Sequence, residues 1–191
     1  MSERSNIVIL IPAYQPDEAL VSLTMQLSLE KFMTVVVNDG SGPDFNSVFE
    51  QLPADVTVLN HASNRGKGKA LRTGLQFIQE SMPVARGIVT ADADGQHLVS
   101  DIMQVAEKLI DRTRAMVIGG RRFEGKVPLH NRLGNMITRW VFSFATRVKV
   151  RDTQTGLRGF TIDLVPELLR LPGDRYEYEI NVLLGAASSP V

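Results

Sequence analysis

The feature that most constrains the fold is a regular alternation of short apolar runs with amphipathic stretches. The runs are rich in β-branched residues, each is four or five residues long, and polar or glycine-rich residues come after each one. Continuous hydrophobicity over so few residues is typical of parallel strands buried on both faces. The expected strands are residues 7–11, 34–37, 56–59, 87–90 and 115–118.

The stretches between these runs have the periodicity of helices. Leucine and isoleucine recur on one face within residues 17–30, 67–80 and 100–111. Ser100, at the start of the last stretch, is a residue type that caps helix N-termini. Repeated strand–helix–strand units predict an α/β fold with a mostly parallel sheet flanked by helices. We expect the 191 residues to form one domain.

Composition excludes several classes of protein. Cysteine is absent, which rules out a disulfide framework, thiolate zinc and cysteine catalysis. Basic and acidic residues number 21 each, so no charge excess suggests nucleic acid as a partner. The longest uncharged runs, 12 residues each, are too short to span a bilayer. An acid at Glu3 argues against a signal peptide, and we expect a cytoplasmic protein.

The zero net charge conceals a segregation of charge along the chain. Residues 121–158 contain nine basic residues and two acidic ones, so the rest of the chain is acidic. Such asymmetry often marks the part of a protein that meets an anion.

In parallel α/β sheets, ligands bind at the carboxyl ends of the strands, so the residues directly after each run are candidates for a site. Asp39 comes after the second run and could accept hydrogen bonds from a base or ribose, although its surroundings are also ordinary turn chemistry. Residues 64–70 come after the third run, with three cations and two glycines at a helix start. They suit a phosphate but also a solvated loop.

Two carboxylates come after the fourth run. Asp92 and Asp94 would repel each other at the end of a buried strand unless something neutralises them. Oxygen ligands at this spacing suit Mg²⁺ or Mn²⁺, with Gln96 as a third ligand; a turn with exposed acids is the alternative. An EF-hand calcium loop is excluded, because Met103 stands at the twelfth position, where such a loop requires a glutamate. For His97, a structural role is favoured over that of ligand or base.

Taken together, blocks of residues occur in the order and spacing of family 2 glycosyltransferases, and they most closely resemble its dolichyl- or polyprenyl-phosphate sugar transferases. The resemblance covers about residues 6–182. The blocks are residues 11–14, 35–41, 64–71, 92–97, 119–121, 152–160 and 175–179.

The resemblance implies a GT-A (Rossmann-like) fold, a nucleoside-diphosphate sugar as donor, and Mg²⁺ or Mn²⁺ as cofactor. By position, the nucleotide-binding residues would be Pro12, Tyr14, Val37, Asp39, Arg65, Lys69, Asp92 and Ala93. The metal site would comprise Asp92, Asp94 and Gln96. Arg121 matches a phosphate contact, and Arg132 and Arg158 are expected to meet the acceptor phosphate.

The implied reaction is a single displacement at the sugar with inversion, in which Asp94, Arg121 and Asp152 are the expected catalytic residues. A hydroxyl acceptor needs a general base, whereas a phosphate is already ionised at neutral pH. Asp152 is a weak candidate base because Arg151 and Arg158 favour its charged form. A lipid-phosphate acceptor is therefore favoured. Transfer to a saccharide or protein hydroxyl, and a non-catalytic nucleotide-binding module, remain open alternatives.

Two segments bear on the acceptor side. Residues 129–148 form a basic amphipathic pattern with Trp140, which suits either peripheral contact with a membrane surface or ordinary packing on the domain. After the expected helix at 177–184 the chain soon stops, where members of the family continue. We therefore expect a truncated or divergent C-terminus.

Overall fold

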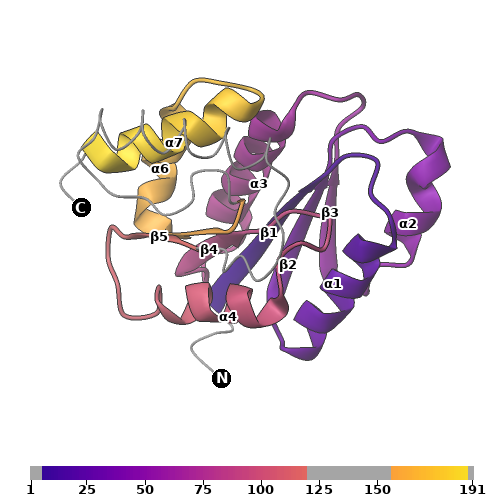
Figure 1. The fold of residues 1–191 in the computed structure, drawn as a ribbon, viewed down its shortest axis with the longest axis horizontal. Coiled ribbons are helices and arrows are strands. Elements are labelled where there is room, and N and C mark those ends of the chain that lie inside the picture. Colours follow the sequence, from indigo (N-terminus) through magenta and orange to yellow (C-terminus); the bar gives the residue numbers. More distant parts are fainter. Residues whose placement is uncertain (1–5, 120–155, 189–191) are drawn as a thin grey trace, which may run out of the picture.

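A six-stranded sheet forms the centre of the computed structural model, which describes residues 6–119 and 156–188 (Figure 1). Its strands are β1 (Ile7–Ala13), β2 (Met33–Asn38), β3 (Val56–Asn60), β4 (Gly87–Thr90), β5 (Met116–Ile118) and β6 (Arg158–Thr161). The helices are α1 (Glu18–Leu29), α2 (Asn46–Glu50), α3 (Lys67–Ser81), α4 (Val99–Glu107), α6 (Val165–Arg170) and α7 (Tyr176–Ser188). Short 3₁₀ turns, η2 (Pro43–Phe45) and η3 (Ile162–Leu164), precede α2 and α6.

The strand order is β3-β2-β1-β4-β6-β5. The first four strands in this order pair in parallel, whereas β6 is antiparallel to both β4 and β5. The predicted α/β fold with a mostly parallel sheet is therefore confirmed. The sequence did not predict β6, because Arg158–Thr161 contains no continuous apolar run.

The helices cover both faces of the sheet, as the periodic leucines predict. Alternate side chains of β1 point to opposite faces. Ile9 and Ile11 pack with α1 and α4 on one face. Val8 and Leu10 pack with α3, α6 and α7 on the other, and Figure 1 shows these two helical layers on either side of the strands.

The bounds of the predicted strands and helices agree with the structure to within a few residues. Two other expectations, on strand burial and on a helix cap, do not hold. β3 and β5 are only partly buried because they are the edge strands of the sheet. The Ser100 cap is wrong: α4 begins one residue earlier, and its capping residue Leu98 makes no side-chain capping bond.

Several predictions lie outside the described residues. These are the basic amphipathic helix at 129–148, the argument from Glu3 against a signal peptide, and the divergent C-terminus from residue 189 on. Within the described ranges, no helix combines the length and the apolar character that crossing a bilayer requires.

Leu10 tests the importance of the central strand for stability. Its side chain is fully buried against α3, where a Cβ on Gly74 would collide with it. Leu10→Ala should lower the free energy of unfolding by about 2–5 kcal/mol because it leaves a cavity. Urea unfolding measures the change. Leu29→Ala, at a side chain that is 81% exposed, is the control, and a loss of equal size there would contradict the prediction.

Candidate active site

A pocket of about 400 Å³ lies where the carboxyl ends of β1, β2 and β4 meet the amino ends of α3 and α7. It is therefore at the edge of the sheet that the parallel topology predicts for a ligand. Its lining consists of Pro12, Ala13, Tyr14, Asp39, Asn64, Gly66, Lys67, Ala70, Asp92, Ala93, Asp94, Arg175 and Tyr176.

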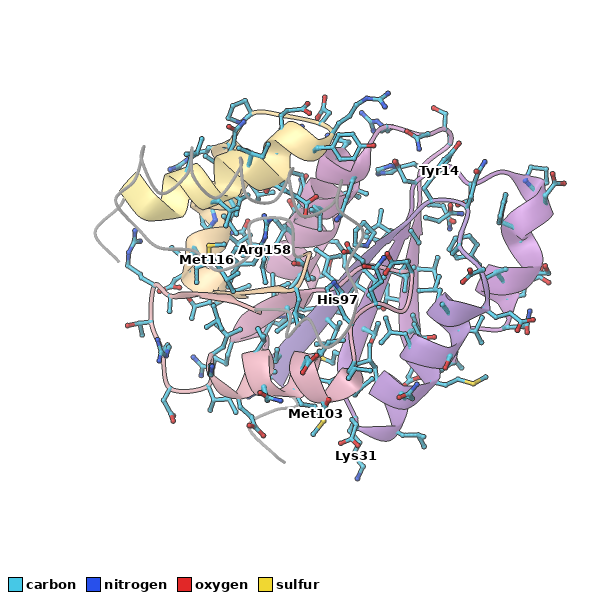
Figure 2. The ribbon with its side chains drawn as sticks, in the orientation of Figure 1. Tyr14, Lys31, His97, Met103, Met116 and Arg158 are labelled. Carbon is cyan, nitrogen blue, oxygen red and sulfur yellow. The ribbon has the colours of Figure 1, made fainter. Side chains whose placement is uncertain are left out.

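Tyr14 forms an aromatic part of the pocket wall. It lies on the loop after β1, and its side chain is 50% exposed, at the upper right of Figure 2. The backbone N–H of Gln15 donates to the Ser41 hydroxyl at 2.9 Å and so ties this loop to the one after β2. An exposed aromatic ring beside Pro12 presents a surface on which a planar base can stack.

Asp39 lines the pocket, but its carboxylate makes its hydrogen bonds to other residues of the protein. Its side chain is almost fully buried, and its oxygens accept the backbone N–H groups of Arg65 at 3.0 Å and Gly66 at 2.8 Å. The Nδ1 atom of His61 lies 2.6 Å from the same carboxylate, and Nε2 lies 3.0 Å from the Thr73 hydroxyl. Asp39 therefore fixes the loop before α3 against the end of β2.

Asp92 is neutralised within the protein. One carboxylate oxygen accepts from the Lys67 ammonium at 2.6 Å, and the other lies 3.2 Å from Nε2 of the buried His97. Burial alone would raise the pKa of Asp92, but the His97 hydrogen bond and the Lys67 charge hold it well below its ordinary value. Gly156 leaves the space for this carboxylate, since a Cβ there would lie 2.3 Å from it.

Lys67, the first residue of α3, connects the sheet to α7. Besides Asp92, its ammonium contacts a carboxylate oxygen of Glu179 on α7 at 3.1 Å. Burial would lower the pKa of Lys67, but the charges of Glu179 and Asp92 raise it above its ordinary value. Arg158 supports the arrangement from β6, because its Nη1 donates to the Glu179 carbonyl at 2.8 Å.

Asp94 is exposed at the pocket and closes a tight turn. Its carboxylate accepts from the Gln96 backbone N–H at 3.1 Å and from the Gln96 side-chain amide at 2.7 Å. In the ranges 6–119 and 156–188, no group of three or more His, Cys, Asp or Glu side chains is arranged to hold a metal ion. The negative charge of this turn is already partly balanced without a metal ion, because Lys67 and His97 both contact the Asp92 carboxylate.

The start of α7 is held against α3, which brings Arg175 and Tyr176 to the pocket. The Lys69 backbone N–H donates to the Asp174 carbonyl at 2.9 Å, and the Arg72 guanidinium bonds the Asp174 carboxylate. Gly66 permits this approach, since a Cβ there would lie 2.4 Å from the Asp174 carbonyl oxygen. Tyr176 is 76% exposed.

The structure places the predicted site residues in three groups. Most of the predicted nucleotide-binding residues and both metal-binding aspartates do line the pocket: Pro12, Tyr14, Asp39, Asp92, Ala93 and Asp94. Others lie elsewhere: Val37 in the core, Arg65 and Gln96 on the surface, Lys69 partly buried on α3, and Arg158 buried against α7, near the centre of Figure 2. Arg121, Arg132 and Asp152 lie outside the described residues.

Sequence reasoning missed four residues of this constellation. Lys67 lies in the block at 64–71, where the resemblance implies nucleotide contacts for Arg65 and Lys69 instead. Arg175, Tyr176 and Glu179 lie in the last block, for which the resemblance implies no particular role. The signal was present in the alternation of aromatic and acidic residues at 175–179, but only the docking of α7 on α3 shows where it points.

A doubly covered α/β sheet with an aromatic wall, carboxylates and a lysine at its carboxyl edge has the arrangement in which α/β proteins bind nucleotides and other small ligands. The sequence profile of glycosyl transferase family 2 matches residues 8–164. The chain belongs to this family and is a nucleotide-sugar-dependent glycosyltransferase.

Individual proteins agree with this assignment. The chain is 28% identical to a UDP-N-acetylglucosamine–dolichyl-phosphate N-acetylglucosaminyltransferase of Methanococcus voltae, with 90% of this chain and 76% of the relative covered. A mycobacterial protein shares its fold with a TM-score of 0.69 at 19% identity, over 95% of this chain and 62% of the other. Residues 1–349 of TarS from S. aureus, solved in complex with UDP, share the fold with a TM-score of 0.56 at 14% identity. The match covers 95% of this chain and 55% of the TarS chain.

Gly156→Ala tests whether Asp92 needs the space that this glycine provides. The added methyl would collide with both carboxylate oxygens, so we expect a loss of about 1–3 kcal/mol in the free energy of unfolding. Urea unfolding measures it. Gly185→Ala is the matched control, because the nearest atom to its Cβ would lie at an ordinary 3.5 Å. Equal stability of the two variants would be inconsistent with the described packing.

Asp39→Ala tests whether this carboxylate organises the loop before α3. The change leaves the N–H groups of Arg65 and Gly66 without their acceptor, and we expect a loss of at least about 2 kcal/mol. Asp44→Ala, at an exposed position on η2, should change stability by less than about 0.5 kcal/mol. Thermal and urea unfolding of both variants measure these changes in stability. Similar losses in the two variants would show that Asp39 does not organise the loop before α3.

Proposed function

We propose that this glycosyltransferase moves a sugar from a UDP-sugar to a polyprenyl or dolichyl phosphate by a single displacement with inversion. The observation that carries the proposal is the pocket itself. It combines a wall suited to a nucleoside, at Pro12 and Tyr14, with a polar floor at Asp92 and Asp94.

The donor half of the proposal rests on the shape and chemistry of the pocket. A volume of about 400 Å³ falls within the range of small-molecule sites. The solved structure of TarS contains UDP, and the name of the M. voltae relative specifies a UDP-linked sugar. Both favour uracil as the base of the donor.

The acidic turn suits a divalent cation in its chemistry, since the two aspartates line one pocket and the side-chain amide of Gln96 contacts Asp94. Asp92, Asp94 and Gln96 would hold Mg²⁺ or Mn²⁺, which would stabilise the charge that develops on the leaving diphosphate. Meanwhile, Tyr14 and Pro12 orient the nucleoside, and His97 keeps Asp92 in its position.

The acceptor half rests on the relative that transfers to dolichyl phosphate, together with the weak candidate base. A phosphate acceptor brings its own negative charge and needs no proton removed at neutral pH. In this mechanism, Arg121 contacts the donor diphosphate and Arg132 contacts the acceptor phosphate. Asp152 is not required as a general base.

A direct test combines binding with transfer. Thermal-shift and calorimetric titrations with UDP-, GDP- and CDP-sugars, with and without Mn²⁺, should show the strongest response for a UDP-sugar with Mn²⁺. Asp94→Ala should weaken Mn²⁺-dependent donor binding by at least about tenfold, because it removes a charged ligand of the ion. Unchanged affinity would refute the metal assignment. The exposed Asp101→Ala on α4 is the control.

The same preparation tests the acceptor. Labelled sugar should enter the organic phase when polyprenyl phosphate is present, and the product should have an inverted anomeric configuration. Transfer to a saccharide or peptide hydroxyl in its place would replace the acceptor assignment. Donor binding without transfer to any of these acceptors would favour the non-catalytic nucleotide-binding module.

A further inference from the structure

Lys67 occupies a position that the proposed reaction has not yet used. Its side chain lines the donor pocket, and its ammonium is shared between Asp92 at 2.6 Å and Glu179 at 3.1 Å. Glu179 does not line that pocket. It lies behind Lys67, beside a small separate cavity that also involves Thr90 and Arg158.

The two carboxylates that share Lys67 are held differently. Glu179 is fixed from behind, because Arg158 bonds its carbonyl oxygen at 2.8 Å and places a second guanidinium nitrogen 3.9 Å from its carboxylate. Asp92 faces the pocket and has His97 as a further partner at 3.2 Å. A lysine that moved away from Asp92 but stayed with Glu179 would leave Asp92 in contact with His97 and Glu179 in contact with Lys67.

We propose that Lys67 binds the diphosphate of the donor and that Glu179 is the residue that positions it, an inference that rests on the nucleoside-diphosphate donor proposed above. A lysine ammonium has three N–H donors, of which the two carboxylates occupy two. Phosphate oxygens in the pocket engage the third donor and compete with Asp92 for another. Glu179 keeps the ammonium at the pocket throughout this exchange.

A purely structural ion pair would give the same contacts, so the test needs a measurement that only a phosphate-binding role changes. The ratio of affinities for a nucleoside diphosphate and for its own nucleoside is such a measurement. Loss of folding or of the nucleoside wall lowers both affinities, whereas loss of a phosphate contact lowers only that for the diphosphate.

The experiment is calorimetry on the full chain with UDP, GDP and CDP, followed by the tightest of them and its nucleoside on each variant. Lys67→Met should weaken diphosphate binding by at least about tenfold with nucleoside affinity unchanged, and Lys67→Arg should restore most of it. Lys108→Met, at an exposed lysine beyond the end of α4, is the control for removal of a positive charge and should change neither affinity.

Glu179→Gln tests the positioning role. It keeps the size of the side chain but removes the charge that holds Lys67, and we expect diphosphate affinity to fall about three- to tenfold with nucleoside affinity unchanged. Glu179→Asp should recover part of this loss. Glu80→Gln, at an exposed glutamate on α3, is the control.

Each outcome decides one of the claims. An affinity ratio for Lys67→Met within about twofold of wild type would overturn the diphosphate contact while leaving the proposed function intact. A diphosphate affinity that is unchanged or higher in Glu179→Gln would overturn the positioning role. If the wild-type chain bound none of the three nucleoside diphosphates, the proposed function and this inference would both fail.

Discussion

The contact of Lys67 with both Asp92 and Glu179 is the interaction on which the site depends, because it joins the sheet to α7 beside the pocket. Removing charges from water costs several kcal/mol per ion, so such a contact survives only where each charge has partners. Here His97 supports Asp92, and Arg158 supports Glu179. The resulting chain of alternating charges fixes the start of α7, and hence the places of Arg175 and Tyr176 on the pocket wall.

The antiparallel β6 explains why residues far apart in the sequence meet here. β6 runs opposite to β4, so its beginning lies beside the end of β4, just before Asp92. The Thr90 hydroxyl donates to the Gly156 carbonyl at 2.8 Å and secures this junction. Gly119, after β5, donates its N–H to the Leu157 carbonyl at 2.9 Å. A fully parallel sheet would have placed the beginning of this strand at the opposite edge, away from the acidic turn.

The sequence predicted the parts of this protein that depend on local pattern. Continuous apolar runs identified the strands, and the rule for strand ends pointed to Asp39, Asp92 and Asp94, all of which line the pocket. It could not predict the features that depend on tertiary contacts. β6 has no strand pattern of its own, and Glu179 acquires its partner Lys67 only because α7 packs against α3. Val37 lies inside a matching block, but its side chain packs in the core, which the block alone does not reveal.

The sequence predicts that Asp92 and Asp94 repel each other unless something neutralises them, and the structure supplies part of that neutralisation from its own residues. Asp92 carries an internal counter-charge at 2.6 Å, and the His97 hydrogen bond and the Lys67 charge lower its pKa against the effect of burial. Asp94 differs from it: it is exposed, and both of its bonds in the described part of the chain come from the uncharged Gln96. An incoming divalent cation would have to displace an ammonium to reach Asp92, but only an amide to reach Asp94. Of the two carboxylates, Asp94 is therefore the one that a cation would reach at the lower electrostatic cost.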